Sequence, residues 1–217
     1  MFADMFHIID TPSSEMLNYG SYSVEFGFFS NGGSISQIDF GFSKFLNIGL
    51  SLGLDQFIGN KQLKVTTPAF KAKLKIYDGD MKLPMALIGF DGQDYFLSFK
   101  KRKYFQKGRG LYFVIGKELF LENLMFNIGI NANIISKPKF YGFLNATAPI
   151  YKEMTYLMIE YDNINYCKDA RLNLGLRFTL MKCMDIDYII RNCCRGKDKN
   201  LNISNEKILK VRHFLKF

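Results

Sequence analysis

Apolar and polar residues alternate through the segment ARLNLGLRFTLMKCMDIDYII, residues 170–190, with one short interruption. Before the interruption, one register carries Leu172, Leu174, Leu176 and Phe178, and the other carries Arg171, Asn173, Gly175, Arg177 and Thr179. After it, Met184, Ile186, Tyr188 and Ile190 continue the apolar register, and Asp185, Asp187 and Arg191 continue the polar one. Successive side chains of a strand point to opposite faces, so the pattern predicts an antiparallel hairpin with one apolar and one polar face.

The same alternation recurs along the chain after residue 18. Candidate strands lie at 19–29, 35–43, 45–54, 68–77, 82–91, 109–117, 123–134, 139–148, 153–162, 170–179, 183–191 and 207–217. Each is about 8 to 11 residues long, the length that a tilted strand needs to cross a bilayer. We therefore predict an all-β fold, an antiparallel up-and-down transmembrane β-barrel of about 12 strands over residues 19–217. Residues 1–18 form a separate N-terminal segment, periplasmic or plug-like, and YFLSF at 95–99 is assigned to a loop.

The links between these strands differ in length in a regular way. Short links fall at 43–44, 78–81, 118–122, 149–152 and 180–182, and the longest fall at 55–67, 92–108 and 192–206. Short and long links therefore gather at opposite ends of the sheet. Transmembrane barrels have this asymmetry, with short periplasmic turns and longer outer loops.

The composition of the polar register decides which way the barrel faces. In 45–54, leucine and isoleucine alternate with Asn47, Gly49, Ser51 and Gly53, and Gly27, Gly41, Gly89, Gly116 and Gly175 fit the same register of other strands. Glycine weakens a strand, so a solvated face has little use for it, whereas a narrow lumen needs small side chains. This favours an apolar face toward lipid. The alternative is a soluble β-barrel with the same Leu and Phe residues inside, around an apolar ligand.

Bulk properties agree with a single domain. The 217 residues are 48% hydrophobic and 23% charged, with a mean hydropathy of −0.04. There is no run of about 18 apolar residues that would make a membrane helix. The first residues, MFADMFHIIDTPSSEM, lack a basic region followed by a long apolar run, so no signal peptide is expected in this chain.

The carboxyl end, KILKVRHFLKF, alternates and terminates in Phe217. It resembles the signal by which the barrel-assembly machinery recognises outer-membrane barrels, a last strand that ends in an aromatic residue. His213 on the apolar register departs from that pattern.

Several segments, in order along the chain, resemble the small YjbH-like outer-membrane barrels associated with exopolysaccharide in Gram-negative and spirochaete-type bacteria. They are DTPSSEMLNYGSYSVEFGFFSNGG at 10–33, QIDFGFSKFLNIGLSLGLDQFIG at 37–59, PAFKAKLKIYDGDMKLPMALIGFDGQDYF at 68–96, GLYFVIGKEL at 110–119, MIEYDN at 158–163 and RLNLGLRFTLMKCMDIDYIIRN at 171–192. The resemblance implies a bacterial outer-membrane location and a barrel fold, and it carries no catalytic residues.

Candidate chemistry is sparse. His7 and His213 are the two histidines of the chain, and neither has a serine and a carboxylate in a plausible triad, so no enzyme activity is expected. The four cysteines show no CxxC spacing, and we expect neither a metal nor another cofactor. A disulfide between Cys167 and either Cys193 or Cys194 is feasible in neighbouring outer loops, while Cys183 lies at the opposite end of its hairpin.

Charged residues on the inward register are the main candidate site. They are Glu25, Asp39, Lys71, Lys73, Lys75, Glu160, Asp162, Arg171, Arg177, Asp185, Asp187 and Arg191. Arg177 is expected within reach of Asp185 or Asp187 across its hairpin. Two interpretations stay open: the charges pair and fill the lumen, or they line a small polar channel and tune its ion selectivity.

The net charge of +9 concentrates in predicted outer loops. The main cluster is Lys100, Lys101, Arg102, Lys103, Lys107 and Arg109. It would attract anionic lipid head groups or an acidic polysaccharide, or be a solvated loop without a ligand. No RNA-binding motif accompanies it, so nucleic acid is not an expected partner. The expected state is a monomer in membrane lipid, with a structural or small-solute or polysaccharide-related transport role.

Overall fold

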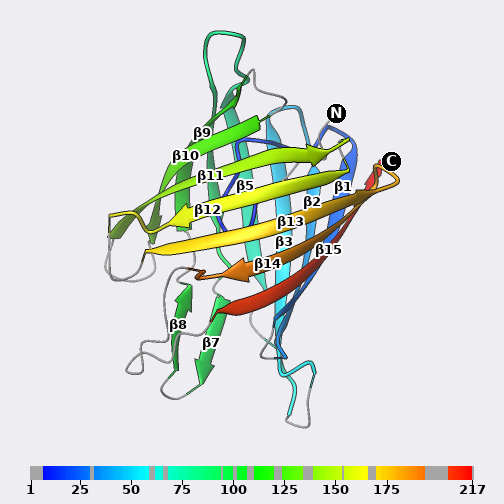
Figure 1. Cartoon of the computed structure of the whole chain (residues 1–217), viewed down its shortest axis with the longest axis vertical. Coiled ribbons are helices and arrows are strands. Elements are labelled where there is room, and N and C mark those ends of the chain that lie inside the picture. Colours follow the sequence, from blue (N-terminus) through cyan, green and yellow to red (C-terminus); the bar gives the residue numbers. More distant parts are fainter. Residues whose placement is uncertain are drawn as a thin grey trace.

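The computed structural model describes residues 7–29, 32–58, 62–65, 68–93, 95–99, 102–106, 110–119, 124–133, 139–152, 154–165, 170–193 and 205–216. Within them, twelve antiparallel strands close into a barrel, which confirms the predicted all-β up-and-down fold. Figure 1 shows these strands wound around a common axis. None of the described residues forms a helix long and apolar enough to cross a bilayer.

The twelve barrel strands follow the ranges expected from alternation, with ends shifted slightly. They are β1 (Ser21–Phe29), β2 (Ser34–Gly41), β3 (Leu46–Asp55), β5 (Ala69–Tyr77), β6 (Met85–Asp91), β9 (Gly110–Leu119), β10 (Leu124–Asn133), β11 (Lys139–Tyr151), β12 (Thr155–Asp162), β13 (Arg171–Leu180), β14 (Met184–Arg191) and β15 (Glu206–Lys216). The first and last strands complete the ring, with Ser21 opposite Lys216 and Phe29 opposite Ile208. Closure leaves the ring without an unpaired edge.

Three further strands lie outside the ring. The short β4 (Lys64–Val65) pairs with β3. The strands β7 (Tyr95–Phe99) and β8 (Arg102–Gln106) form a separate hairpin below the barrel in Figure 1. The assignment of 95–99 to a loop is therefore wrong. YFLSF is rich in aromatic and apolar residues, which favour extended backbone, and the segment that follows supplies its partner.

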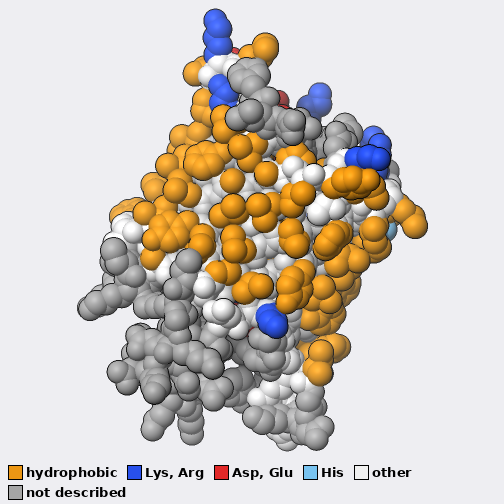
Figure 2. Space-filling view, in the orientation of Figure 1, with side chains coloured by type: hydrophobic (Ala, Val, Ile, Leu, Met, Phe, Trp, Pro, Cys, Tyr) orange, Lys and Arg blue, Asp and Glu red, His pale blue; other side chains and the backbone are white. Residues whose placement is uncertain are grey.

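The two faces of the barrel wall differ sharply in polarity. At the middle of their strands, Leu50, Ile128 and Ile130 point outward and are 53%, 51% and 52% exposed. On the alternate register, Lys71, Asn127 and Arg177 are completely buried. Figure 2 shows apolar side chains spread over the outer surface, while the Lys and Arg side chains in view lie mostly toward its ends. The barrel thus has an apolar exterior and a polar interior.

The three longest connections of the barrel gather at one of its ends. Residues 42–45, 78–84, 120–123, 152–154 and 181–183 connect strands at one end, and we call this the short-link end. The opposite, long-link end carries the three longest connections, 56–68, 92–109 with its extra hairpin, and 192–205. The shorter connections 30–33, 134–138 and 163–170 lie at the same end. The first residue of β1, Ser21, and the last residue of β15, Lys216, both lie at the short-link end because β1 and β15 are antiparallel.

Residues 7–18, which we call the internal segment, run through the interior of the barrel. Its apolar side chains complete two small buried clusters. Ile8 and Ile9 pack with Met158, Ile189 and Ile208, and Met16 packs with Leu87, Tyr112, Val114 and Phe143. The interior is therefore filled partly by the chain's own N-terminal residues.

Inward-facing glycines make the space that this filling needs. A Cβ on Gly41 would overlap the backbone oxygen of Asn18, and one on Gly116 would overlap the Ser14 hydroxyl. Gly89 lies beneath the ring of Tyr112, its partner across β6 and β9. These inward glycines, expected from the sequence to relieve a crowded lumen, sit where the internal segment or a neighbouring ring comes closest.

Candidate functional site in the barrel interior

A buried charge group lies between β13 and β14. Arg177 and Asp187 are directly opposite each other in the sheet register. The guanidinium Nε and Nη2 of Arg177 donate to the two carboxylate oxygens of Asp187 at 2.6 and 2.7 Å. Asp185 Oδ2 lies 3.7 Å from the same Nε, and Thr179 Oγ1 donates to Asp185 Oδ1 at 2.8 Å. The expected contact of Arg177 is confirmed, and its two-point geometry is the strong form of this pair.

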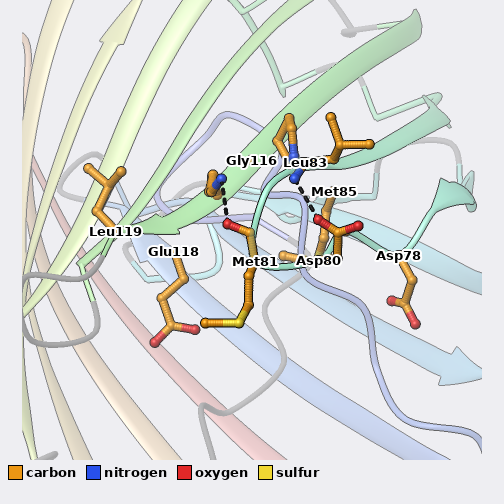
Figure 3. Close-up of a pocket in the computed structure, with 11 residues that line it drawn as sticks. Asp78, Asp80, Met81, Leu83, Met85, Gly116, Glu118 and Leu119 are labelled. Atoms are coloured by element: carbon orange, nitrogen blue, oxygen red, sulfur yellow. Dashed lines mark hydrogen bonds between the residues drawn. The ribbon is translucent and has the colours of Figure 1, made fainter.

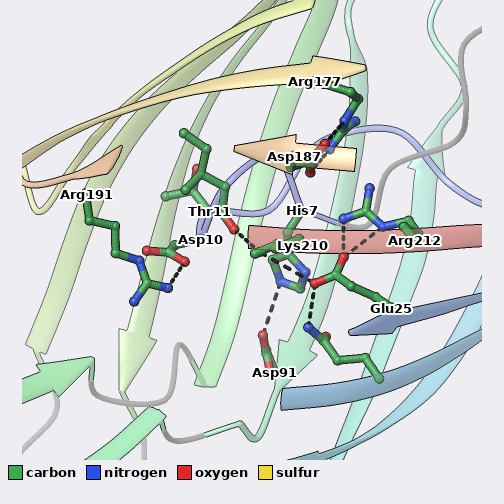
Figure 4. A network of polar contacts seen from close by, with 12 residues as sticks. His7, Asp10, Thr11, Glu25, Asp91, Arg177, Asp187, Arg191, Lys210 and Arg212 are labelled. Atoms are coloured by element: carbon green, nitrogen blue, oxygen red, sulfur yellow. Dashed lines mark hydrogen bonds and ion pairs between the residues drawn. The ribbon is translucent and has the colours of Figure 1, made fainter. Parts of the chain in front are cut away.

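A second group centres on Glu25 of β1. Its carboxylate accepts hydrogen bonds from the guanidinium of Arg212, Oε1 accepts from Gln37 Nε2 at 2.9 Å, and Lys210 Nζ lies 3.6 Å away. Figure 4 shows Arg212 and Lys210 approaching Glu25 from β15. Arg212 and Lys210 were not among the expected lumen residues. Their positions on β15 were readable, because they alternate with Leu209, Val211 and Leu215.

A third group joins the internal segment to the wall near the long-link end. His7 Nε2 lies 3.1 Å from Asp91 Oδ2, and Lys71 Nζ lies 3.9 Å from the same carboxylate oxygen. Lys71 also donates to Gln37 Oε1. Asp91, at the end of β6, was a further missed residue, although it shares the inward register of Leu87 and Gly89.

Arg191 of β14 is shared between the wall and the internal segment. Its Nη2 contacts Asp10 Oδ1, and its Nη1 donates to Glu206 Oε2 at 3.1 Å. The residues Asp10 and Arg191 are 181 positions apart in the sequence. No local pattern pairs them, so Asp10 could be found only from the folded chain.

The structure places the expected lumen residues as follows. Buried in the interior are Glu25, Asp39, Lys71, Lys73, Glu160, Asp162, Arg177, Asp185, Asp187 and Arg191. Arg171 is half-buried at the start of β13. Lys75 lies nearer the short-link end, where its Nζ is 2.5 Å from Asp78 Oδ1, and its side chain is 17% exposed. Acidic and basic groups alternate around the interior, so their charges largely compensate.

A pocket of about 550 Å³ opens at the short-link end between residues 78–85 and the end of β9. Figure 3 shows Met81, Leu83 and Met85 on one side of it and Leu119 on the other, with Asp78, Asp80 and Glu118 around it. The carboxylate of Asp80 accepts hydrogen bonds from the backbone N–H of Leu83 and of Lys82, at 2.6 and 2.7 Å. These bonds lower the pKa of Asp80, and they order the connection that forms the pocket.

Several expected site residues fall elsewhere. In the basic cluster, Lys100, Lys101, Lys107 and Arg109 lie outside the described residues, and Arg102 and Lys103 belong to β8. Cys167, Cys194 and Phe217 also lie outside them, so the expected disulfide and the terminal aromatic signal stay predictions. Cys193 donates its thiol to the Ile190 carbonyl at 3.2 Å, and Cys183 lies at the short-link end.

No group of three or more His, Cys, Asp or Glu side chains within the described part of the chain is arranged to hold a metal ion. The interior groups instead suit hydrogen bonding and ion pairing. No protein-family model matches the sequence, and no curated protein matches it.

Proposed function

We propose that this chain is a bacterial outer-membrane β-barrel whose lumen is filled by its own internal segment. Its role is structural or transport-related in the cell envelope. The observation that carries the proposal is the polarity of the barrel wall, which is the reverse of that in a soluble barrel: Leu, Ile and Phe side chains lie outside and charged groups lie inside. A lipid environment accommodates such an exterior, and a closed barrel satisfies every backbone group between neighbouring strands.

Hydrophobic energetics support the membrane location. Soluble monomers rarely expose continuous apolar patches above a few hundred Å², and each Å² of apolar surface costs about 25 cal/mol in water. Here exposed apolar side chains recur at mid-strand on β3, β5, β10 and β13. Charged outward-facing side chains lie near strand ends, as with Lys117 on β9 and Lys207 on β15. This is the distribution that a bilayer with polar borders would select.

The soluble alternative fits the wall less well. A soluble barrel for an apolar ligand requires the leucine and phenylalanine register to face inward. That register faces outward, and the interior instead holds Arg177, Lys71 and Glu160. The small apolar clusters inside are completed by the protein's own Ile8, Ile9 and Met16.

The gathering of the three longest connections at one end suggests an orientation. Short links face the periplasm and long links face outward in transmembrane barrels. The positive charge of the basic outer loops would attract anionic lipid head groups or an acidic polysaccharide, and the family resemblance of the sequence favours an exopolysaccharide. In the observed arrangement residues 7–18 occupy the lumen, so solute transport requires their displacement, whereas a structural role does not.

The test is fractionation of expressed protein together with gel mobility before and after heating. The proposal expects a detergent-dependent band in the outer-membrane fraction that shifts on heating. Planar-bilayer conductance then separates the two roles: a steady conductance supports transport, and a silent barrel supports the structural role. A monomer that stays soluble in plain buffer and shows no heat shift would refute the membrane location.

A further inference from the structure

The inner wall holds the main chain of the internal segment, through residues drawn from strands all around the barrel. On the acceptor side, Glu160 Oε2 accepts from the backbone N–H of Asp10 at 2.9 Å and of Thr11 at 2.7 Å. Asn127 Oδ1 accepts from the backbone N–H of Ser14 at 2.9 Å. Backbone N–H groups are common to every residue except proline, so these contacts do not depend on side-chain identity.

The donor side complements this arrangement. Lys73 Nζ donates to the backbone carbonyls of Ser13 and Glu15 at 2.9 and 2.7 Å. Lys210 Nζ donates to the carbonyl of Ile9 at 2.6 Å. Asn145 Nδ2 donates to the carbonyl of Pro12 at 3.0 Å. Consecutive peptide groups of the segment are thus held from different sides of the lumen.

The wall groups are themselves held in place. Asn173 Nδ2 donates to Glu160 Oε1 at 2.7 Å, and Asn127 Nδ2 donates to Asn145 Oδ1 at 2.8 Å. Preorganised partners of this kind reduce the cost of ordering a ligand. All four side chains are buried, with at most 2% exposure. Charged and amide groups so deeply buried require partners, which a polypeptide main chain supplies.

Side chains of the segment add further contacts with the wall, among them His7, whose Nε2 lies 3.1 Å from Asp91 Oδ2. Ile8 and Ile9 fill one apolar cluster and Met16 fills the other. Thr11 Oγ1 donates to Glu160 Oε2 at 2.7 Å, and Asp10 pairs with Arg191, as Figure 4 shows. The stretch 13–15 between these positions is held through its backbone.

We propose that the barrel interior is a binding site for a short polypeptide that carries a turn, as the internal segment does between His7 and Pro12. The wall contacts main-chain groups from Ile9 to Glu15 and accepts apolar side chains at both ends of that stretch. The chain's own N-terminal segment is a tethered occupant that another copy of the same peptide can replace. The proposal rests on the internal plug of the proposed function and not on the membrane location. The class of ligand proposed for the lumen is therefore a polypeptide.

The test uses the full chain, folded and then cut. A protease site inserted between Tyr19 and Gly20 lies at an exposed turn, where Tyr19 is 66% exposed, and cleavage leaves the N-terminal fragment held only by non-covalent contacts. Exchange with a fluorescent peptide of residues 1–18 is followed by native electrophoresis. We expect saturable entry of the peptide, with heat-shifted mobility of the barrel verifying that it is folded.

Two competing peptides separate main-chain from side-chain recognition. A peptide with Ala at positions 13, 14 and 15 should compete within about threefold of the native one, since it keeps all backbone donors and acceptors. A peptide with the Ser14 amide replaced by an ester should compete about tenfold more weakly, because Asn127 loses its backbone donor. Equal weakening by both changes would refute main-chain recognition.

A wall variant provides an independent test. Lys73→Met removes the donor to Ser13 and Glu15, and we expect it to weaken peptide binding about tenfold. The matched control is Lys75→Met on the same strand, whose Nζ contacts Asp78, and it should leave binding unchanged. If the labelled peptide never enters the cut, folded barrel, the segment is a permanent filler and the proposal is wrong. A cut protein soluble in plain buffer would refute the membrane location while leaving the exchange measurable.

Discussion

Arg177 and Asp187 face each other across β13 and β14, joined by two hydrogen bonds of 2.6 and 2.7 Å, with both side chains at most 1% exposed. Each charge is far from bulk water, so each depends on the other for its stability. Asp185 shares the guanidinium at 3.7 Å. The cluster therefore behaves as one electrostatic unit, and removal of one member leaves uncompensated charge in the interior.

Replacing Arg177 by Met should destabilise the barrel by about 3–5 kcal/mol, because two carboxylates then remain buried without their cation. The paired change R177M/D187L should recover part of that loss, since it removes a charge of each sign. Urea unfolding followed by the heat-shifted gel band measures both. The control is Lys207→Gln, an exposed charge on β15, which should leave the unfolding midpoint unchanged. A single variant as stable as the unmodified barrel would mean that the interior pair contributes little.

The outward face provides a depth-dependent test of the membrane proposal. Ile128→Lys puts a charge in the middle of β10, opposite Ile115 and Leu144. In a bilayer this should cost about 2–4 kcal/mol, whereas Leu119→Lys at the end of β9 should cost about 1 kcal/mol or less. Folding equilibria in lipid vesicles compare the two. Equal small costs would argue that the face meets water.

Gly41→Ala should displace Asn18, the last residue of the internal segment, and thereby release the segment from the lumen. The added Cβ would overlap the backbone oxygen of Asn18, which cannot rotate away as a side chain can. Overpacking of this kind costs about 1–3 kcal/mol. A reporter cysteine, Ser13→Cys, should become accessible to a maleimide reagent in the Gly41→Ala background and stay protected without it.

The matched control for this change is Gly27→Ala. Gly27 also faces inward on a strand, but a Cβ there would lie 3.7 Å from Lys210 Cγ, an ordinary contact. The reporter cysteine should stay protected in that background. Protection in both variants would show that the segment adapts to the extra methyl group.

Acid should open the connection that carries Asp80. Hydrogen bonds from Leu83 and Lys82 hold the pKa of Asp80 below its ordinary value, so the folded protein binds this proton less readily than the unfolded chain. The stabilisation of this connection by ionised Asp80 is therefore complete above the pKa of Asp80 in the unfolded chain, about 4. It is lost as the pH falls through the lower pKa of Asp80 in the folded protein. Backbone amide chemical shifts of Lys82 and Leu83 in micelles should titrate with it. Asp80→Asn keeps an acceptor oxygen and should abolish this titration.

The alternation of side chains let the sequence predict the strands, their inward and outward registers and the contact of Arg177 with its hairpin neighbours. A period of two is a local property of extended backbone, and hairpin partners are close along the chain. The same alternation places Asp91, Lys210 and Arg212 on the inward registers of their strands, so the sequence was sufficient to predict that they face the interior. The pairing of β7 with β8 was missed because the sequence of a short aromatic segment does not indicate which strand it pairs with.

Only the tertiary structure decided what fills the lumen. Thr11 meets Glu160 across 149 positions and Asp10 meets Arg191 across 181, and the internal segment has no periodicity that marks it as an interior element. Its place depends on space left by glycines on several strands at once, and on charges brought together by closure of the ring. Such contacts are non-local: alternation determines which side of the wall each residue occupies, and the closed fold alone determines what it meets there.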